Sequence, residues 1–424
     1  MRIYNLFPLL AGPFSHWEPH LERAADMGFD WIFVNPMQKP GKSGSLYSIR
    51  DYFKINPALV DRLDRRSAND QVRRMVAKAN SLGLRVMQDL VINHCAYDSA
   101  LLKKHPEWFV QENGRVAHPY CMEDGHKVVW RDLAQFDHRH TSDGEGLYHY
   151  CRQVVEHLIS LGFEGFRCDA AYQIPSSFWE RLISEVKRAH PEVFFVAETL
   201  GCSAEQTKQT AAAGFDYIFN SSKWWDFSGP WLLEQYDLTR ETVPSISFPE
   251  SHDTPRLFAE SGNNVAALEQ RYLFSALFSA GVMMPMGYEF GFEKPLHVVE
   301  TRPADWETTA VDLRDFIRHV NRVKRQQPVF QEESATLLLE HSNPSIMLMW
   351  KGSVRTNQEA LLILNKNLSH QEHCFVEDLY RYIQGSPPLL DLSPQWAMDF
   401  LPTPFHFDLG PGMGRVLVTR AGSG

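Results

Sequence analysis

The chain has 424 residues, 44% of them hydrophobic, which is enough for a barrel of about 250 residues and a smaller second domain. Its formal charge of -10 comes from 52 acidic and 42 basic residues, without long runs of one sign. No basic stripe is available for nucleic acid phosphates, so a neutral or weakly charged substrate fits better. Six cysteines show neither metal-binding spacing nor the density of a disulfide scaffold, which favours reduced thiols in a cytoplasm.

The apolar segments at the N-terminus and near residue 280 do not have the pattern of export or membrane signals. Residues 1–10 contain an Asn and a Pro within their apolar run, and no small-residue cleavage site follows. Residues 272–290 are uncharged up to Glu289, but two glycines and a proline interrupt them, as in a helix followed by a buried strand. We therefore predict a cytoplasmic protein that does not interact with a membrane.

Eight short apolar runs ending in polar residues recur along the first 290 residues, which is typical of buried parallel strands. They are residues 3–7, 31–35, 84–91, 165–170, 193–199, 217–220, 245–253 and 282–289. Helical patterns lie between several of them, at residues 16–27, 67–82, 147–161, 176–189 and 268–280. This alternation predicts an α/β fold. Eight strands, with no glycine-rich dinucleotide loop after the first, favour a closed (β/α)8 TIM barrel over an open sheet.

Two segments depart from this alternation. Residues 95–146 follow the third strand, are rich in His, Pro, Gly and aromatic residues, and are too long for an ordinary connection. After a helix at 313–325, short strands separated by turn residues are expected at 336–349, 360–364, 389–392 and 414–419. We predict a barrel over residues 1–330 with an inserted subdomain at 95–146, and a C-terminal antiparallel β-sandwich domain at 331–424.

Polar residues stand at or just after the ends of several predicted strands. Because the C-termini of parallel barrel strands surround one concave face, these residues are expected to meet there. They are Asp89, Asn93, His94, Arg167, Asp169, Glu198, His252 and Asp253. A single carboxylate at such a position more often caps a helix or pairs with an arginine. Four carboxylates with two histidines and an arginine at one mouth indicate instead a functional site.

Two carboxyl groups can cleave a glycosidic bond with retention of configuration. One attacks the anomeric carbon, and the other protonates the leaving oxygen and then activates water or another acceptor. Asp169 and Glu198 come from adjacent predicted strands. We therefore expect them to lie about 5 to 5.5 Å apart, as retention requires.

Four segments resemble, in order and in strand placement, the four sequence motifs of the α-amylase superfamily, glycoside hydrolase family 13. They are Asp89-Leu-Val-Ile-Asn-His94, Gly165-Phe-Arg-Cys-Asp169, Ala197-Glu198-Thr199 and Ser251-His252-Asp253. The resemblance covers residues 1–330. It implies a retaining enzyme that cleaves α-1,4-glucosidic bonds of maltooligosaccharides or α-glucans through a covalent glycosyl-enzyme.

The resemblance also implies a role for each matched residue. Asp169 would be the nucleophile, held ionised by Arg167, and Glu198 the general acid/base. Asp253 would be the third carboxylate, which binds sugar hydroxyls and stabilises the distorted transition state.

Four further matched residues would bind the substrate. His94 and His252 would hydrogen-bond the sugar in subsite −1, and Tyr47 would stack on it. Asp89, which opens the first motif, and Arg167 complete the set of predicted substrate-binding residues.

We predict no cofactor and no metal site. Tyr172-Gln173 stand where other α-amylases have Lys-His, residues that bind the next sugar and supply a calcium ligand through a carbonyl. Asn93 matches the calcium Asn of the family and Asp132 could be a second oxygen ligand. The alternative is that both are hydrogen-bonded loop anchors.

Three functions remain open at this stage. Residues 287–292 and 301–306 are similar to the branch with maltosyltransferases that use maltose 1-phosphate, so a transglycosylase is an alternative to a hydrolase. A non-catalytic carbohydrate-binding barrel is a third possibility, but it is expected to have lost one of the three acids, which are all present here. Trp224 and Trp225 are candidates for acceptor subsites, with core packing as the alternative.

Overall fold

The computed structural model describes residues 1–123, 126–383 and 388–421. Eight parallel strands close into a barrel in the order β1-β16-β15-β14-β13-β12-β5-β2. Their bounds are β1 (Arg2–Leu6), β2 (Trp31–Val34), β5 (Arg85–Leu90), β12 (Gly165–Cys168), β13 (Phe194–Ala197), β14 (Tyr217–Phe219), β15 (Ser245–Ser247) and β16 (Gly281–Pro285). Each strand falls on one of the eight predicted apolar runs, so the prediction of a TIM barrel is confirmed.

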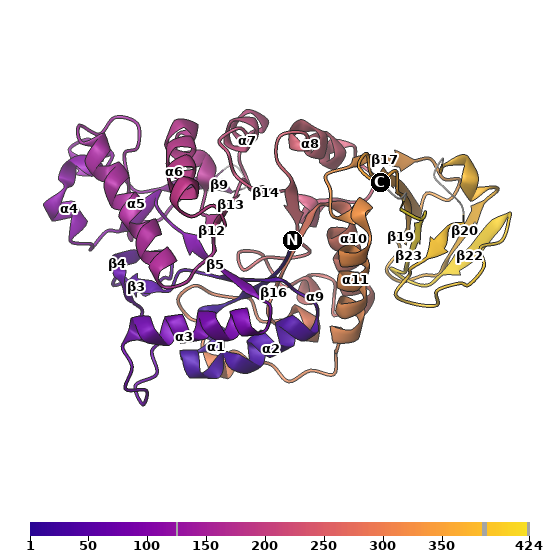
Figure 1. Ribbon diagram of the computed structural model, residues 1–424, viewed down its shortest axis with the longest axis horizontal. Coiled ribbons are helices and arrows are strands. Elements are labelled where there is room, and N and C mark those ends of the chain that lie inside the picture. The colour runs from indigo at the N-terminus through magenta and orange to yellow at the C-terminus, as the bar shows by residue number, and fades with distance from the viewer. Residues whose placement is uncertain (124–125, 384–387, 422–424) are drawn as a thin grey trace.

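Helices surround the strands on the outside of the barrel (Figure 1). They are α1 (Pro8–Ala11), α2 (Glu18–Asp26), α3 (Ala68–Ser81), α5 (Gly144–Ser160), α6 (Ser176–Ala189), α7 (Ala204–Ala211), α8 (Trp231–Thr239), α9 (Leu257–Glu260), α10 (Val265–Phe278) and α11 (Arg314–Gln326). The predicted helical patterns correspond to α2, α3, α5, α6, α10 and α11. None of the described helices is both long and apolar enough to cross a membrane.

Large apolar side chains fill the barrel interior. Trp31, Phe33, Met87, Phe219 and Met283 belong to one cluster of buried residues contributed by the barrel strands. The barrel is therefore a packed core and not a pore, so a ligand site has to lie at its mouth.

The loops after β2 and β5 carry small antiparallel sheets. The first is β3 (Gln38–Pro40) with β4 (Ile49–Ile55), and the segment after β5 holds β6 (His94–Ala96), α4 (Leu101–Lys104), β7 (Gln111–Glu112), β8 (Arg115–Val116), β9 (Tyr120–Glu123), β10 (His126–Val129) and β11 (Leu133–Gln135). β6 pairs with β11, so the long segment returns to its starting point beside the barrel. Within the predicted insertion, residues 124–125 lie outside the described residues.

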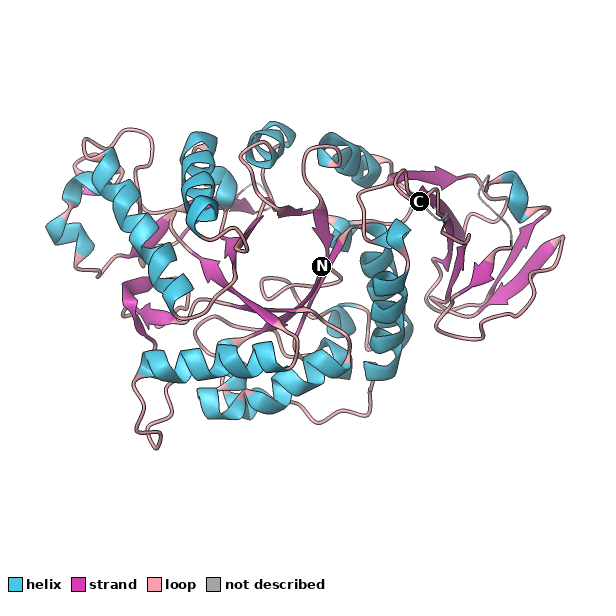
Figure 2. Ribbon diagram, in the orientation of Figure 1, coloured by secondary structure: helices cyan, strands magenta, loops and turns pink. Residues whose placement is uncertain are grey.

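The C-terminal part is antiparallel, as predicted, and lies beside α10 and α11 (Figure 2). A five-stranded sheet has the order β17-β18-β19-β23-β21, and β20 pairs with β22. The bounds are β17 (Ala335–Leu339), β18 (Ile346–Gly352), β19 (Glu359–Asn365), β20 (Glu372–Val376), β21 (Leu390–Asp391), β22 (Phe405–Leu409) and β23 (Gly414–Val418). The predicted strand at 336–349 is in fact two strands, because a turn around Asn343 reverses the chain.

The five-stranded sheet is buried on both faces. In β18, Met347 and Met349 pack into the cluster that continues through the barrel helices. Ile346 and Leu348 point the other way and pack with Phe405 in a separate cluster. Because side chains alternate across a strand, the same strands complete two cores.

Candidate active site

The structure brings the predicted site residues together at the C-terminal mouth of the barrel. Arg167 lies in β12 and Asp169 directly after it, Glu198 follows β13, and His252 and Asp253 follow β15. Asp89 lies in β5, His94 in β6, and Tyr47 in the loop between β3 and β4. The contacts below connect all eight residues.

Arg167 is the centre of the cluster. Its Nη1 lies 3.0 Å from Asp89 Oδ1 and 2.8 Å from Asp169 Oδ1, while Nη2 lies 3.8 Å from Glu198 Oε2. The Arg167 side chain is only 5% exposed. One buried cation therefore faces three carboxyl groups, so the charge at this site favours protonation of one of them.

Asp89 forms a buried ion pair with Arg167. Burial raises the pKa of Asp89 to about 6; the charge of Arg167 opposes this rise and that of Asp169 adds to it. Asp89 Oδ2 also accepts a hydrogen bond of 2.6 Å from the Tyr47 hydroxyl. These contacts fix Asp89 as part of the floor of the site, beneath the cavity.

Asp169 is held in the orientation of an anion. It accepts a hydrogen bond of 2.8 Å from Arg167 Nη1 on Oδ1 and one of 3.4 Å from Asn93 Nδ2 on Oδ2. Both donors fix the orientation of its carboxyl group. The side chain is 15% exposed and lines a cavity, so it is accessible to a ligand.

Glu198 has the environment of an acid that can be protonated at neutral pH. Burial raises its pKa to about 7; the charge of Arg167 opposes this rise, and the charge of Asp169 adds to it. Its oxygens accept hydrogen bonds from the backbone N–H groups of Ala170, at 2.7 Å, and Leu200, at 3.1 Å. Ala170 has φ +39°, a left-handed conformation that is costly for a residue with a Cβ. A strained backbone next to Asp169 therefore orients Glu198.

Tyr47, His252 and Asp253 form the opposite wall. The rings of Tyr47 and His252 are stacked, with centroids 5.7 Å apart and planes 3° from parallel. His252 Nε2 lies 2.6 Å from the Tyr47 hydroxyl and 2.9 Å from Asp253 Oδ2. The Asp253 side chain is 59% exposed, whereas that of His252 is buried. His252 thus connects an exposed carboxylate to the floor of the site.

His94 lies on the other side of Tyr47. Its Nε2 is 3.2 Å from the backbone carbonyl of Tyr47, and its ring lines the same cavity as Asp169. Burial lowers the pKa of His94, which favours the neutral ring. Its Nδ1 is buried without a partner among the described residues.

Two cavities meet at the carboxyl groups. One has a volume of about 320 Å³ and is lined by Asp169 and Trp130, and the other, of about 750 Å³, is lined by Trp224 and Tyr120. Both are also lined by Pro119, Tyr172, Gln173, Glu198 and Asp253. An extended ligand can therefore occupy space on both sides of Glu198 and Asp253.

The two candidate tryptophans differ in position. Trp224 is 53% exposed and faces the larger cavity. Trp225 is fully buried, donates a hydrogen bond of 2.7 Å to the carbonyl of Gly229, and packs against Phe274. The prediction of an acceptor contact for Trp225 is therefore wrong, because its ring is part of the core.

Sequence reasoning missed a buried ion pair that frames the His252-Asp253 segment. Arg256 Nη1 lies 2.8 Å from Glu250 Oε1, and both side chains are at most 2% exposed. Arg256 also donates to the carbonyls of Met286 and Lys294. Glu250 stands two residues before His252, and Arg256 stands three residues after Asp253. Opposite charges at this spacing could have indicated a loop closed by an ion pair.

The candidate calcium ligands are engaged in other contacts. Asn93 Nδ2 donates to Gln173 Oε1 at 3.4 Å as well as to Asp169, and the carbonyl of Asp132 accepts from the Tyr97 N–H at 2.8 Å. These contacts use Asn93 Nδ2 and the backbone of Asp132, whereas Asn93 Oδ1, the atom that would bind an ion, is buried without a partner among the described residues. We derive no step through calcium. In the described ranges, one cluster of three possible metal ligands exists, formed by other residues, namely His105, Glu107 and Asp143.

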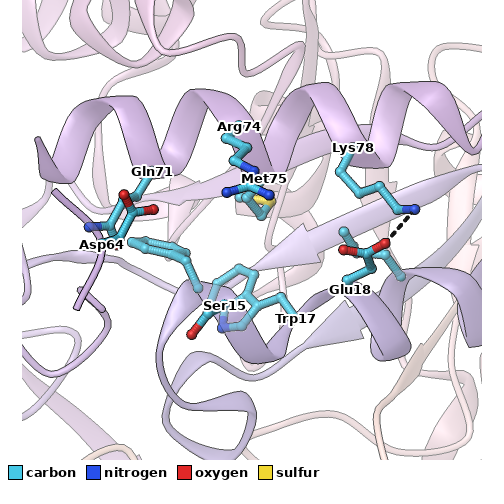
Figure 3. A pocket seen from close by; sticks show the side chains of 10 residues that line it. Ser15, Trp17, Glu18, Asp64, Gln71, Arg74, Met75 and Lys78 are labelled. Atoms are coloured by element: carbon cyan, nitrogen blue, oxygen red, sulfur yellow. Dashed lines mark ion pairs between the residues drawn. The ribbon is translucent and has the colours of Figure 1, made fainter. Parts of the chain in front are cut away.

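A further pocket lies outside the barrel, between α2 and α3, far in sequence from the motif residues. Its volume is about 130 Å³, and Trp17, Arg74 and Met75 are among the residues that line it (Figure 3). Lys78 and Glu18 form an ion pair of 2.7 Å across it. None of the eight predicted site residues lines this pocket.

Comparisons with known proteins agree with this geometry. Solved structures of α-amylases match the fold of this chain at full length. The α-amylase from Lactobacillus plantarum covers 99% of this chain, and the chain covers 98% of it, with a TM-score of 0.77 and 19% identity. The α-amylase from H. orenii has a TM-score of 0.79, with 15% identity and 99% of each chain covered.

One family model and several relatives are similar to this chain in sequence. The family described as glycogen debranching enzyme, glucanotransferase domain, matches residues 1–114. The α-1,4-glucan:maltose-1-phosphate maltosyltransferases of Burkholderia pseudomallei and Mycobacterium tuberculosis are both 26% identical, over 85% and 84% of this chain. The chain spans only 32% and 54% of the length of these two relatives. This chain is therefore similar to the maltosyltransferases over part of their length.

Proposed function

We propose that the chain is a retaining enzyme that acts on α-1,4-glucosidic bonds of maltooligosaccharides or α-glucans. Asp169 attacks the anomeric carbon and forms a glycosyl-enzyme, while Glu198 gives a proton to the leaving oxygen. Glu198 then takes a proton from the acceptor that releases the sugar. Asp253 and His252 bind sugar hydroxyls and stabilise the distorted ring.

One observation carries this proposal: the two acids share Arg167 but have opposite environments. Arg167 and Asn93 donate to Asp169, which suits a nucleophile that must be ionised. Burial raises the pKa of Glu198 to about 7, which suits an acid that must hold a proton. Two neighbouring carboxyl groups, one of which can hold a proton, are characteristic of glycosidic bond cleavage.

A transglycosylase is the second candidate, and the relatives favour it. Both maltosyltransferases named above match over more than four fifths of this chain. Hydrolysis and transfer share the glycosyl-enzyme and differ in the acceptor that attacks it. The larger cavity, with Trp224 and Tyr120 on its walls, has room for a sugar acceptor.

The test is the product profile from maltoheptaose, with Asp169→Asn as the control, run without and then with inorganic phosphate. Shorter maltosaccharides alone would support hydrolysis, longer products would support transfer, and a sugar phosphate would support a phosphorylated donor. Wild-type-like turnover by Asp169→Asn would overturn the assigned nucleophile. No turnover by the wild type would favour the non-catalytic binding barrel.

The proposal includes activity without a cofactor and a cytoplasmic location. Tyr172-Gln173, in place of the Lys-His that supplies a calcium ligand in other α-amylases, supports the absence of calcium from the mechanism. We expect turnover and melting temperature to be unchanged by a chelator. A loss of activity that calcium restores would contradict this part of the proposal.

A further inference from the structure

The loop that follows β21 presents two aromatic side chains to solvent. Trp396 is 80% exposed and Phe400 is 77% exposed. Trp396 also has φ +53°, a left-handed conformation that is costly for a residue with a Cβ. A large exposed ring on strained backbone calls for an explanation by function, because such strain persists only where the surroundings enforce it.

A buried ion pair enforces this conformation. Arg415, in β23, has a fully buried side chain and donates from Nη1 to the carbonyls of Gln395, at 3.0 Å, and Trp396, at 2.7 Å. Its Nη2 lies 2.8 Å from Asp391 Oδ2, which also accepts from the Met398 N–H at 3.0 Å. The backbone on both sides of Trp396 is therefore anchored from below.

The same loop is attached to the barrel. Gln395 Nε2 donates to Glu269 Oε2 in α10 at 2.8 Å, and His319 Nε2 in α11 lies 2.9 Å from the carbonyl of Leu392. The loop is thus fixed at the junction of the two parts of the molecule. A ligand that stacks on Trp396 meets a ring whose backbone is already ordered, which lowers the entropy lost on binding.

The chemistry of the surface points to a neutral ligand with apolar faces. The buried charges beneath Trp396 are paired with each other, so the loop offers an indole face, an N–H and the exposed carboxylate of Asp399, whose oxygens can accept from sugar hydroxyls. Sugar rings match this, because their C–H groups pack on aromatic faces and their hydroxyls accept from N–H donors. A stable protein interface needs about 800 Å² on each partner, more than two side chains supply.

We propose that Trp396, assisted by Phe400, is a second docking site for an α-glucan chain, outside the catalytic cleft. None of the residues lining the two cavities at the barrel mouth belongs to this loop. The choice of an α-glucan rests on the proposed function, since a polymer held at two places is retained more strongly than at one. The site is expected to matter for polymers and not for short substrates.

The test compares glycogen binding by affinity gel electrophoresis, all in the Asp169→Asn background so that no glycogen is consumed. Adding Trp396→Ala should raise the dissociation constant by about fivefold, the loss expected for one stacking contact. Adding Phe375→Ala is the matched control, because Phe375 is 48% exposed on β20 in the same part of the chain. That control should bind like the parent.

With Asp169 intact, Trp396→Ala should turn over maltoheptaose within about twofold of the wild type. Equal glycogen binding by Trp396→Ala and the control would overturn the docking site. A changed sedimentation coefficient with unchanged glycogen binding would also overturn it, in favour of a protein contact. If the wild type fails to turn over maltoheptaose but Trp396→Ala still weakens glycogen binding, the docking site stands and the catalytic proposal falls.

Discussion

At the residue scale, one guanidinium sets the properties of the site. Arg167 touches three carboxyl groups and is almost fully buried, so it stabilises an anion on the acids nearest to it. Asp169 receives the shortest of these contacts, whereas the Arg167–Glu198 pair is longest, at 3.8 Å. The two acids that we propose as nucleophile and general acid therefore lie at different distances from the same cation.

The pH dependence of the reaction follows from Glu198. Its pKa is raised to about 7, so the acid is protonated below this pH and loses its proton above it. We expect kcat/KM on maltoheptaose to fall about tenfold per pH unit above pH 7. A pH–rate profile checks this, and a basic limb that begins below pH 5 would contradict the role of Glu198.

Replacing Glu198 distinguishes its role from that of a structural residue. Glu198→Gln should lower kcat on maltoheptaose by about 10² to 10⁴-fold, since the glutamine cannot donate a proton to the leaving oxygen. A glycosyl fluoride needs no such proton, so the first turnover with it should be much less affected. Burst kinetics on both substrates measure this, and equal losses would argue against the acid.

The individual site residues were largely predictable, because they stand at or just after strand ends and match known motifs. The position of Trp225 was not predictable, because Trp224 and Trp225 are adjacent tryptophans and the sequence does not distinguish them. Only the fold shows that Trp225 is buried against Phe274 while Trp224 is exposed. The Glu250–Arg256 pair was also missed. A buried pair has no pattern of its own until the fold brings its partners together.

At the element scale, the loop after β15 is closed by Glu250 and Arg256. Glu250 Oε2 accepts from the Leu257 N–H at 2.5 Å, and Arg256 reaches the carbonyl of Met286 beyond β16. This pair connects the loop that carries Asp253 to the next barrel strand. It is a positioning device, because neither side chain lines the cavities at the barrel mouth.

Removing one member of this pair should be costly. Arg256→Met leaves Glu250 buried without its cation and should lower the free energy of unfolding by about 3–5 kcal/mol. At a temperature well below melting, kcat should fall more than KM changes, because Asp253 is displaced. Denaturant titration and steady-state kinetics measure both effects.

Two comparisons control this prediction. Arg73→Met removes an exposed partner of Asp70 and should change stability by at most about 1 kcal/mol. The double variant Glu250→Leu/Arg256→Met should recover part of the stability but not kcat. Full activity of Arg256→Met would show that the pair does not position Asp253.

Elements with a strong apolar period were predictable, and those without it were not. α7 reads AEQTKQTA, with little apolar pattern, and α8 has only a weak helical period, so neither was predicted. β20 and β22 are short and bury alternate residues such as Cys374 and Phe405. Their place depends on the facing sheet rather than on their own composition.

At the scale of the whole molecule, the barrel and the C-terminal sheet share their packing. Lys351, in β18, is buried and donates to the carbonyl of Phe278 at 2.8 Å and the hydroxyl of Tyr236 at 3.0 Å, both on barrel helices. Gln270 in α10 donates to the carbonyl of Asn365 at 2.6 Å. Polar and apolar contacts therefore cross the same boundary.

We expect the full chain to unfold in a single calorimetric transition. Met349→Asp, on the face toward the barrel, should lower that transition as a whole by several degrees, because it buries an unpaired charge. Leu337→Asp, on the neighbouring strand and 55% exposed, should leave it nearly unchanged. Two separate transitions in the wild type would contradict this.

The double burial of the five-stranded sheet also limits how such proteins can recombine. Neighbouring residues of one strand, such as Leu348 and Met349, belong to different cores, so selection on the barrel surface and on the C-terminal layer acts on the same short segments. In a chimera that takes its C-terminal part from a distant relative, the barrel-facing side chains of the sheet no longer fit those of α10 and α11. Its expression should recover when only the barrel-facing alternate positions are restored.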